Sequence, residues 1–291
     1  MHPILFKNSI FEVSSLWFIT TIGIIISFNF FLTQIRRKRL SYKLIIKNQF
    51  YLIIGVILGA RIGGIISNWS FYEPFNFFQK IISFFRIWDN QMSLSGGILT
   101  FILLLLLFIK LYEDENFGRW MDVTAQSVLI LYFFHSIANY FEGQEYGRET
   151  ALPWAVIPEN TNVKYAVPIH PTQIYAAIYI LTIFFSTNIL TKKIEFFKTP
   201  GLQAVLIFIG YSGCKFLESL LRGDDVITIL NIRYDTFFSF LFFILGIIIL
   251  TVLLSKINQE FAEKLTAYKI KSKKIIQKSI NKFKKITTKK S

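Results

Sequence analysis

Seven apolar stretches, each about as long as a lipid bilayer is thick, divide this chain of 291 residues. A helix needs roughly 20 apolar residues to cross the hydrocarbon core, where every backbone polar group must be satisfied internally. The stretches cover residues 13–33, 49–68, 93–112, 121–141, 171–190, 201–220 and 235–255. They predict an all-α, polytopic membrane protein with about seven transmembrane helices.

The composition supports this class and argues against a nucleic-acid-binding protein. Hydrophobic residues make up 53% of the chain and charged residues only 17%, whereas a soluble domain usually has about a quarter. The net charge of +14 comes from basic residues that cluster between the apolar stretches and at the C-terminus. This clustering favours a topology signal over a nucleic-acid surface.

The distribution of Lys and Arg predicts the orientation. Basic residues gather after the first, fifth and seventh stretches, at residues 36–47, 192–198 and 256–290. The intervening segments 142–170 and 222–235 lack this bias. Because short cytoplasmic loops carry the excess of Lys and Arg, we expect the N-terminus outside and the C-terminus in the cytoplasm, in a bacterial inner membrane.

Segments outside the spans complete the predicted organisation. Residues 71–88 are rich in Phe and predict an interfacial amphipathic helix at the outer face, which residues 142–170 join as an outer loop. We expect two domains: a seven-helix transmembrane domain over residues 1–255 and a Lys-rich cytoplasmic tail over residues 256–291.

Polar residues inside the predicted spans are the first functional candidates, because a charge there costs about 2.5–3.5 kcal/mol on insertion scales. These residues are Arg61, His135, Asn139, Lys215 and Arg222. In the predicted orientation all except Arg61 lie toward the outer face, together with the pair Gly96-Gly97. This grouping predicts a polar cavity that opens to the outside.

Such a cavity suits the headgroup of an anionic phospholipid. Arginine binds phosphate with two nitrogens, lysine acts as a point charge, and glycine lets a headgroup approach backbone N–H groups. Simpler interpretations stay open. Lys215 and Arg222 would snorkel to the headgroups, His135 would hydrogen-bond between helices, and the Gly-Gly pair would serve helix packing.

Five segments, in this order, carry a resemblance to a known family. They are Gly59 to Gly63; Trp88 with Met92 to Gly97; Asn139 to Arg148 with Leu152 to Val156; His170 to Tyr175; and Tyr211 to Asp224. On a frame of seven spans, the chain resembles the prolipoprotein diacylglyceryl transferase family over nearly its whole length.

The resemblance implies a reaction and its partners. The family moves the diacylglyceryl group of phosphatidylglycerol onto the lipobox cysteine of a preprolipoprotein, on the outer face of the inner membrane, and glycerol phosphate leaves. The implied partners are phosphatidylglycerol, the preprolipoprotein signal peptide and the membrane, without nucleic acid, metal or cofactor. The chemistry needs a base near the thiol and a cation near the leaving phosphate.

The resemblance also assigns site residues, although several differ from the family's pattern. Ser95 stands where the family has His, and Lys215 and Ser136 stand where it has Arg. We therefore predict His135, Ser95 and Lys215 as catalytic. The predicted substrate-binding residues are Arg222, Asn139, Arg148, Gly96, Gly97, Gly147, Gln144, Glu145, Arg61 and Tyr211.

These substitutions leave two other functions open. The chain would be a catalytically degenerate homologue that binds phospholipid or lipoprotein, or a transferase with a different donor or acceptor. The first alternative follows from the joint loss of the family's His at Ser95 and of its Arg at Ser136 and Lys215, because a fold does not dictate a function.

Overall fold

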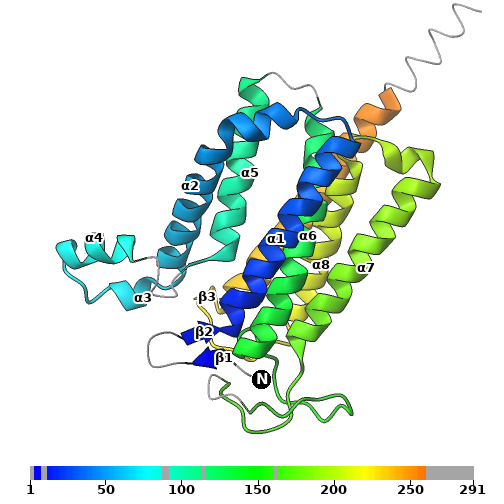
Figure 1. The fold of residues 1–291 in the computed structure, drawn as a ribbon. Helices are drawn as coiled ribbons and strands as arrows, with labels where there is room; N and C mark the ends of the chain where they lie inside the picture. The colour runs from blue at the N-terminus through cyan, green and yellow to red at the C-terminus, as the bar shows by residue number, and fades with distance from the viewer. Residues whose placement is uncertain (1–2, 8–11, 87–91, 113–115, 160–162, 260–291) are drawn as a thin grey trace, which may run out of the picture. The chain divides into compact units, whose positions relative to one another are not determined.

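The predicted helical membrane architecture is confirmed in the computed structural model, which describes residues 3–7, 12–86, 92–112, 116–159 and 163–259 (Figure 1). Within these residues, six helices are long and apolar enough to cross a membrane. They are α1 (Ser15–Arg37), α2 (Tyr42–Ser67), α5 (Leu94–Leu111), α6 (Phe117–Glu142), α7 (Thr172–Lys193) and the helix Tyr234–Gln259.

The sixth predicted span, residues 201–220, is the helix α8 (Leu202–Ser219). It is not among the six, because Gln203, Lys215 and Glu218 make it less apolar than the others. The count of seven spans and their orientation therefore stay predictions.

Short elements lie between the long helices. The strands β1 (Ile4–Lys7) and β2 (Glu12–Ser14) pair antiparallel just before α1, a hairpin that hydropathy does not predict. Ser14 caps α1, since its hydroxyl accepts a hydrogen bond of 3.1 Å from the amide of Leu16. The 3₁₀ helix η1 (Glu195–Lys198) follows α7, and the strands β3 (Thr228–Ile229) and β4 (Ile232–Arg233) follow α8.

The chain forms two compact units, Met1–Phe243 and Ile244–Ser291. Their boundary falls inside the helix Tyr234–Gln259, and the described part of the second unit continues this helix. The predicted domain boundary after residue 255 stays a prediction, and most of the predicted Lys-rich tail lies outside the described residues.

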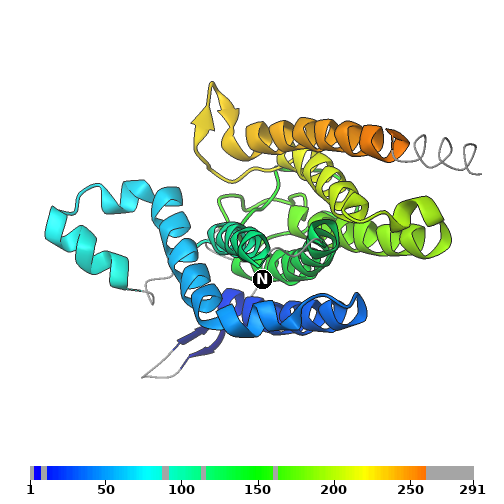
Figure 2. The same ribbon diagram turned by 90° about the horizontal axis from the view of Figure 1, so that it is seen from above.

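In the first unit α1 packs on α6, α2 packs on α5, and α6 also contacts α7 and α8 (Figures 1 and 2). Glycines allow the close approaches. A Cβ on Gly23 of α1 would lie 2.6 Å from Cβ of Phe134 on α6, and one on Gly96 of α5 would lie 2.5 Å from the carbonyl oxygen of Gly59 on α2. Gly96 therefore has a packing role, as small residues commonly do between membrane helices.

A buried apolar cluster joins α1, α2, α5 and α6. The largest of its members that are at most 2% exposed are Phe31, Ile35, Leu44, Leu105 and Trp120. Phe31 contacts Trp120 with a ring-centroid distance of 6.3 Å. Together these side chains join α2 and α5 to α1 and α6.

The predicted interfacial helix over residues 71–88 consists of two short helices, α3 (Trp69–Tyr72) and α4 (Phe77–Phe85), while Trp88 lies outside the described residues. Asn76 and Gln79 form a reciprocal capping box that starts α4. Phe77, Phe78 and Phe85 remain exposed. An exposed apolar face on so short a helix suits the membrane interface.

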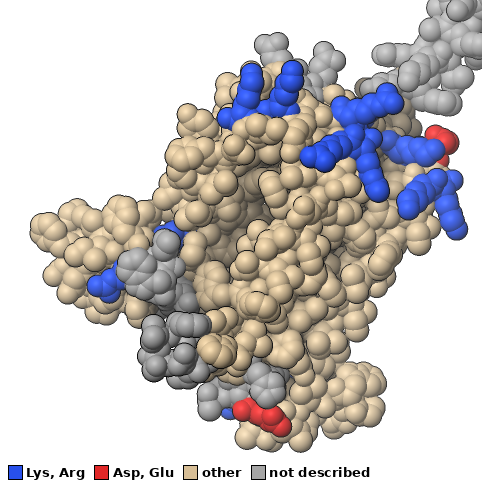
Figure 3. Space-filling model, viewed as in Figure 1, with Lys and Arg blue, Asp and Glu red and all other residues tan. Residues whose placement is uncertain are grey.

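Charged side chains gather near the two ends of the helices on the face shown in Figure 3, and the described surface between them shows no Lys, Arg, Asp or Glu. The Lys and Arg groups are most numerous at the end where α1 stops and α2 begins. This distribution suits helices that cross a bilayer.

Candidate active site

Lys215, near the C-terminal end of α8, is held between two carboxylates. Its Nζ lies 2.8 Å from Oε2 of Glu145 and 2.9 Å from Oε1 of Glu218. Glu218 follows Lys215 by three residues, so the two side chains lie on one face of the helix. Tyr179 of α7 donates a hydrogen bond of 2.8 Å to the other oxygen of Glu218. The site thus begins as a buried contact between α7, α8 and the segment after α6.

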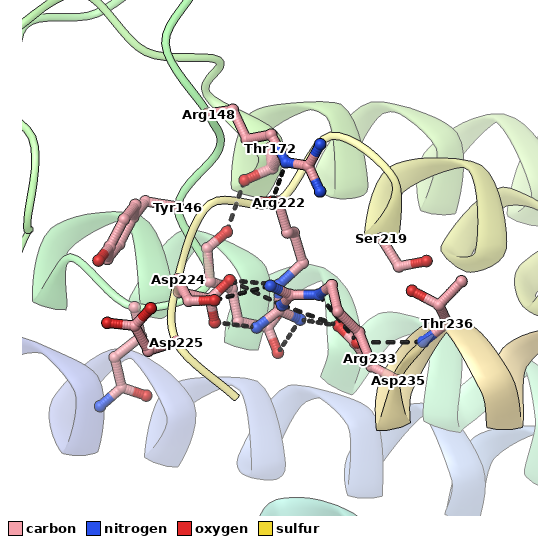
Figure 4. A network of polar contacts seen from close by, with 12 residues as sticks. Tyr146, Arg148, Thr172, Ser219, Arg222, Asp224, Asp225, Arg233, Asp235 and Thr236 are labelled. Atoms are coloured by element: carbon pink, nitrogen blue, oxygen red, sulfur yellow. Dashed lines mark hydrogen bonds and ion pairs between the residues drawn. The ribbon is translucent and has the colours of Figure 1, made fainter. Parts of the chain in front are cut away.

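Arg222 continues this network just beyond α8 (Figure 4). Its Nη1 lies 3.4 Å from Oε1 of Glu145 and 3.1 Å from Oδ2 of Asp235. Its Nε and Nη2 contact both oxygens of Asp224, at 2.9 and 2.5 Å. Arg233 bridges the same two aspartates at 2.9 and 3.2 Å. Arg222 is only 4% exposed, so carboxylates already surround this predicted phosphate-binding residue.

The described charges in this network nearly balance. The cations are Lys215, Arg222 and Arg233, and the carboxylates are Glu145, Glu218, Asp224 and Asp235. Burial raises the pKa of the Glu145 carboxyl, but the charges of Lys215 and Arg222 outweigh burial and hold that pKa well below its usual range. Glu145 therefore stays ionised and links the two cations.

A small layer of backbone hydrogen bonds lies beside the charges. The amide of Gly147 donates to the carbonyl of His170 at 3.1 Å, and the amide of Arg148 donates to that of Leu221 at 2.8 Å. The amide of Gly223 donates to the carbonyl of Tyr146 at 2.9 Å. A Cβ on Gly147 would overlap the carbonyl of His170, so only glycine fits there. The predicted residue Gly147 thus has a structural role in bringing these segments together.

Arg148 lies beside this network, but its charge is less engaged than that of Arg222. Its Nε donates a hydrogen bond of 2.9 Å to the carbonyl of Arg222, and its side chain is exposed. Its two terminal nitrogens have no carboxylate partner within the described part of the chain, and Figure 4 shows them pointing away from the aspartates. They can receive an anion without displacing a carboxylate.

His135 lies on α6, where Thr20 of α1 positions one ring nitrogen. Nδ1 of His135 is 3.4 Å from the Thr20 hydroxyl. The ring of Tyr132 lies 6.5 Å from that of His135 and 5.1 Å from that of Tyr211, measured between centroids. The ring of Tyr211 lies 6.1 Å from that of Tyr179, which bonds Glu218. The structure therefore brings His135, Tyr211 and Lys215 into one region.

Two buried amide side chains at this end carry an oxygen without a hydrogen-bond partner among the described residues. They are Oδ1 of Asn139 and Oε1 of Gln173. The side chain of Gln173 donates a hydrogen bond of 2.5 Å to the backbone carbonyl of Gln144. The backbone N–H of Gln144 in turn donates to the backbone carbonyl of Asn139 at 3.0 Å. Because a buried acceptor without a donor costs about 1–3 kcal/mol, these oxygens suit a ligand that donates hydrogen bonds.

The other predicted residues lie on α2 and α5. The Ser95 hydroxyl is 2.8 Å from that of Ser93 at the start of α5, beside Gly96 and Gly97. Within the described ranges, no hydrogen bond or ion pair joins these residues to Lys215 or His135. Arg61 is 1% exposed, and it donates to the carbonyls of Ser83 and Phe84, the latter at 3.0 Å. Arg61 thus fastens α4 to α2, and the predicted roles of Ser95 and Gly97 stay predictions.

The sequence analysis assigned no site role to several residues that the structure places in or beside this network. These are Thr20, Tyr179, Gln173, Glu218, Asp224, Arg233 and Asp235. The three-residue spacing of Lys215 and Glu218 and the closely spaced charges of 222–235 were available as signals. Within the part of the chain that the structure describes, no group of three or more His, Cys, Asp or Glu could hold a metal ion.

Comparison with known proteins places this site in context. The family model described as prolipoprotein diacylglyceryl transferase matches residues 3–252. The phosphatidylglycerol–prolipoprotein diacylglyceryl transferase of Rickettsia bellii (strain OSU 85-389) is 29% identical over 234 residues, which cover 78% of this chain and 84% of the relative. A protein of the same name from Prochlorococcus marinus (strain MIT 9215) is 30% identical over 194 residues, which cover 60% of this chain and 64% of the relative.

Proposed function

The chain belongs to the prolipoprotein diacylglyceryl transferase family, and from that premise we propose that it transfers the diacylglyceryl group of phosphatidylglycerol to the lipobox cysteine of a preprolipoprotein. The two relatives described above carry both substrates in their names. The reaction takes place at the outer face of the bacterial inner membrane, at the end of the helices that holds Lys215 and Arg222.

The reaction breaks one bond and forms one bond. The cysteine thiol gives its proton to a base, and the thiolate sulfur attacks the glyceryl carbon that bears the phosphate. The carbon–oxygen bond of the phosphodiester breaks as the carbon–sulfur bond forms, so glycerol phosphate leaves with the electron pair. The site must therefore supply a base for the thiol and positive charge for the phosphate.

His135 is the base in this proposal. Thr20 contacts its Nδ1, which leaves Nε2 without a described hydrogen bond and able to take a proton. The contact orients the imidazole, and in the tautomer that acts as the base Nδ1 carries the proton and donates a hydrogen bond to the Thr20 hydroxyl. A base of this kind contributes about 10²–10⁴-fold to the rate.

Arg148 contacts the phosphate, and this assignment carries the proposal. Four carboxylates already neutralise Lys215, Arg222 and Arg233, so these cations hold the framework. Among the described residues, Arg148 is tied to that framework through its Nε alone, and its terminal nitrogens point away from the aspartates. An arginine held at one nitrogen keeps two parallel donors for a phosphate.

The glycerol headgroup meets the two unpartnered amide oxygens. Phosphatidylglycerol carries two hydroxyl donors beyond its phosphate, whereas Asn139 and Gln173 each offer a buried acceptor. A site built to pair with substrate hydroxyls rejects analogues that lack them, because the acceptors then stay unsatisfied. These residues therefore select the donor lipid.

The test uses the full chain in phosphatidylglycerol vesicles with a lipobox peptide, and mass spectrometry to detect the diacylglyceryl thioether. Arg148→Gln should raise the apparent KM for the lipid by about tenfold or more and also lower kcat, since it removes a contact to the phosphate in the bound lipid and as the phosphate leaves. Lys164→Gln is the matched control, because Lys164 is an exposed cation of the same loop that already pairs with Asp225 at 3.2 Å.

Two outcomes would contradict this function. Folded protein that yields no thioether would favour the catalytically degenerate homologue. Thioether formed only from vesicles of another phospholipid would favour a transferase with a different donor. Equal KM values for Arg148→Gln and Lys164→Gln would remove Arg148 from the phosphate contact while leaving the reaction in place.

A further inference from the structure

A second polar region lies at the opposite end of the helices from the Lys215 site. It is a cavity of about 730 Å³ between the last turns of α1 and α7, the first turns of α6, and η1. Six basic residues line it, and the one acidic residue among its lining is Asp122. The basic residues are Arg37, Lys38, Arg39, Arg119, Lys192 and Lys198. This is the end where Figure 3 shows most Lys and Arg.

Asp122 does little to neutralise these cations. Its carboxylate accepts hydrogen bonds of 3.0 and 2.9 Å from the amides of Gly201 and Ala204, at the N-terminus of α8. The Lys38 Nζ is 3.9 Å away. Burial lowers the pKa of the Lys38 ammonium although Asp122 opposes the shift, so a second anion nearby would stabilise its charged form.

Among the described residues, most of the remaining cations have no carboxylate counter-ion. Lys198 pairs with Glu195 at 2.5 Å. Arg37, Arg39, Arg119 and Lys192 have no carboxylate partner within the described residues. Positive charges that converge on one cavity raise the local concentration of anions.

Gln203 is the second observation that points to a ligand. It lines the cavity, it is 3% exposed, and its Nε2 has no hydrogen-bond partner in the described part of the chain. A buried N–H donor without an acceptor is costly, and an anionic oxygen in the cavity would satisfy it. The lining also includes four phenylalanines: Phe30, Phe184, Phe185 and Phe197.

We propose that this cavity binds the phosphodiester of an anionic phospholipid, in the leaflet opposite to the one that faces the Lys215 site. The cations sit at helix ends, where lipid headgroups lie, and basic pockets between membrane helices bind such headgroups. The phenylalanines give apolar surface for the acyl chains, which a soluble phosphate would not use. The lipid holds α1, α6 and α7 together at this end.

The test counts tightly bound lipids by native mass spectrometry of the full chain, taken from mixed phosphatidylglycerol and phosphatidylcholine. One triple variant is Arg37→Gln, Arg119→Gln and Lys192→Gln. The matched control is Lys43→Gln, Lys47→Gln and Lys193→Gln, which removes the same charge outside the cavity lining. A third variant, Gln203→Leu, keeps every charge and reports on the cavity even where a triple variant folds poorly.

We expect the cavity variant to retain phosphatidylglycerol about tenfold more weakly than the control, since each cation near the surface contributes measurably to lipid binding. Gln203→Leu should weaken retention a few-fold, and thioether formation should persist in all three. If both triple variants retained phosphatidylglycerol equally, general surface charge would explain any weaker retention, and the proposal would be overturned. Displacement of the lipid by millimolar inorganic phosphate would also overturn it, in favour of a soluble anion.

Discussion

Arg222 and Arg148 are neighbours in space with opposite expected effects on substitution. The family resemblance assigns substrate binding to both. In the structure Arg222 is buried among three carboxylates, whereas Arg148 is exposed. We expect Arg222→Lys to lower stability and Arg148→Gln to weaken lipid binding.

The magnitude follows from the geometry of the guanidinium. Arg222 contacts Asp224 along one edge and directs Nη1 to Asp235 and Glu145 along another. A lysine ammonium reaches only one of these directions and loses at least two charged contacts, each worth about 1.5–3 kcal/mol. Arg233 still serves both aspartates, so the net loss should be near the lower limit, about 3 kcal/mol.

Thermal unfolding in detergent measures this loss. For a chain of this size, about 3 kcal/mol corresponds to a fall of roughly 6–12 °C in apparent Tm. Arg148→Gln loses one hydrogen bond to a carbonyl, about 1 kcal/mol or less, and should shift Tm by at most a few degrees. Arg222→Lys with an unchanged Tm and a raised KM for lipid would refute the assignment of Arg222 to the framework.

Three further predictions concern the same end of the molecule. His135→Ala should lower kcat by about 10²–10⁴-fold with lipid KM unchanged, and Thr20→Val should lower kcat less; equal KM increases in both would contradict the role of a base. Because the folded pKa of Glu145 is depressed, its contribution to stability is complete above the unfolded value of about 4.3 and is lost as the pH falls through the lower folded value. The Tm of the wild type should therefore decrease when the pH drops under about 4. In Glu145→Gln, Tm should depend less steeply on pH in this range. Gly147→Ala should cost about 1–3 kcal/mol through overlap with His170, and an unchanged Tm would show that the loop relaxes freely.

Hydropathy alone predicts most of the helical architecture, because membrane helices satisfy their own backbone and need only length and apolar side chains. Most predicted helix ends lie within a few residues of the observed ends. The exception is α2, which begins at Tyr42 rather than near residue 49, since Lys43 and Lys47 depress hydropathy without breaking a helix. The β1–β2 hairpin left no comparable signal.

The site was harder to predict, because its members meet only after folding. The sequence singled out His135, Asn139 and Lys215 as costly polar groups in spans, and the structure brings them to one end. It gave no means to tell that Arg222 is neutralised by Asp224 and Asp235 while Arg148 is not. That distinction depends on long-range packing of the segment after α8 against residues 145–149.

The pairing of Lys215 with Glu145 and Glu218 has a consequence for biogenesis. α8 is not among the six helices that are long and apolar enough to cross a membrane, and an unpaired charge would oppose its exit from the translocon by several kcal/mol. Glu218 travels in the same helix and can neutralise Lys215 before insertion. Glu145 precedes α8 in the chain, so it is already at the membrane when α8 leaves the translocon. Lys215 can therefore pair with Glu218 during insertion and with Glu145 after insertion.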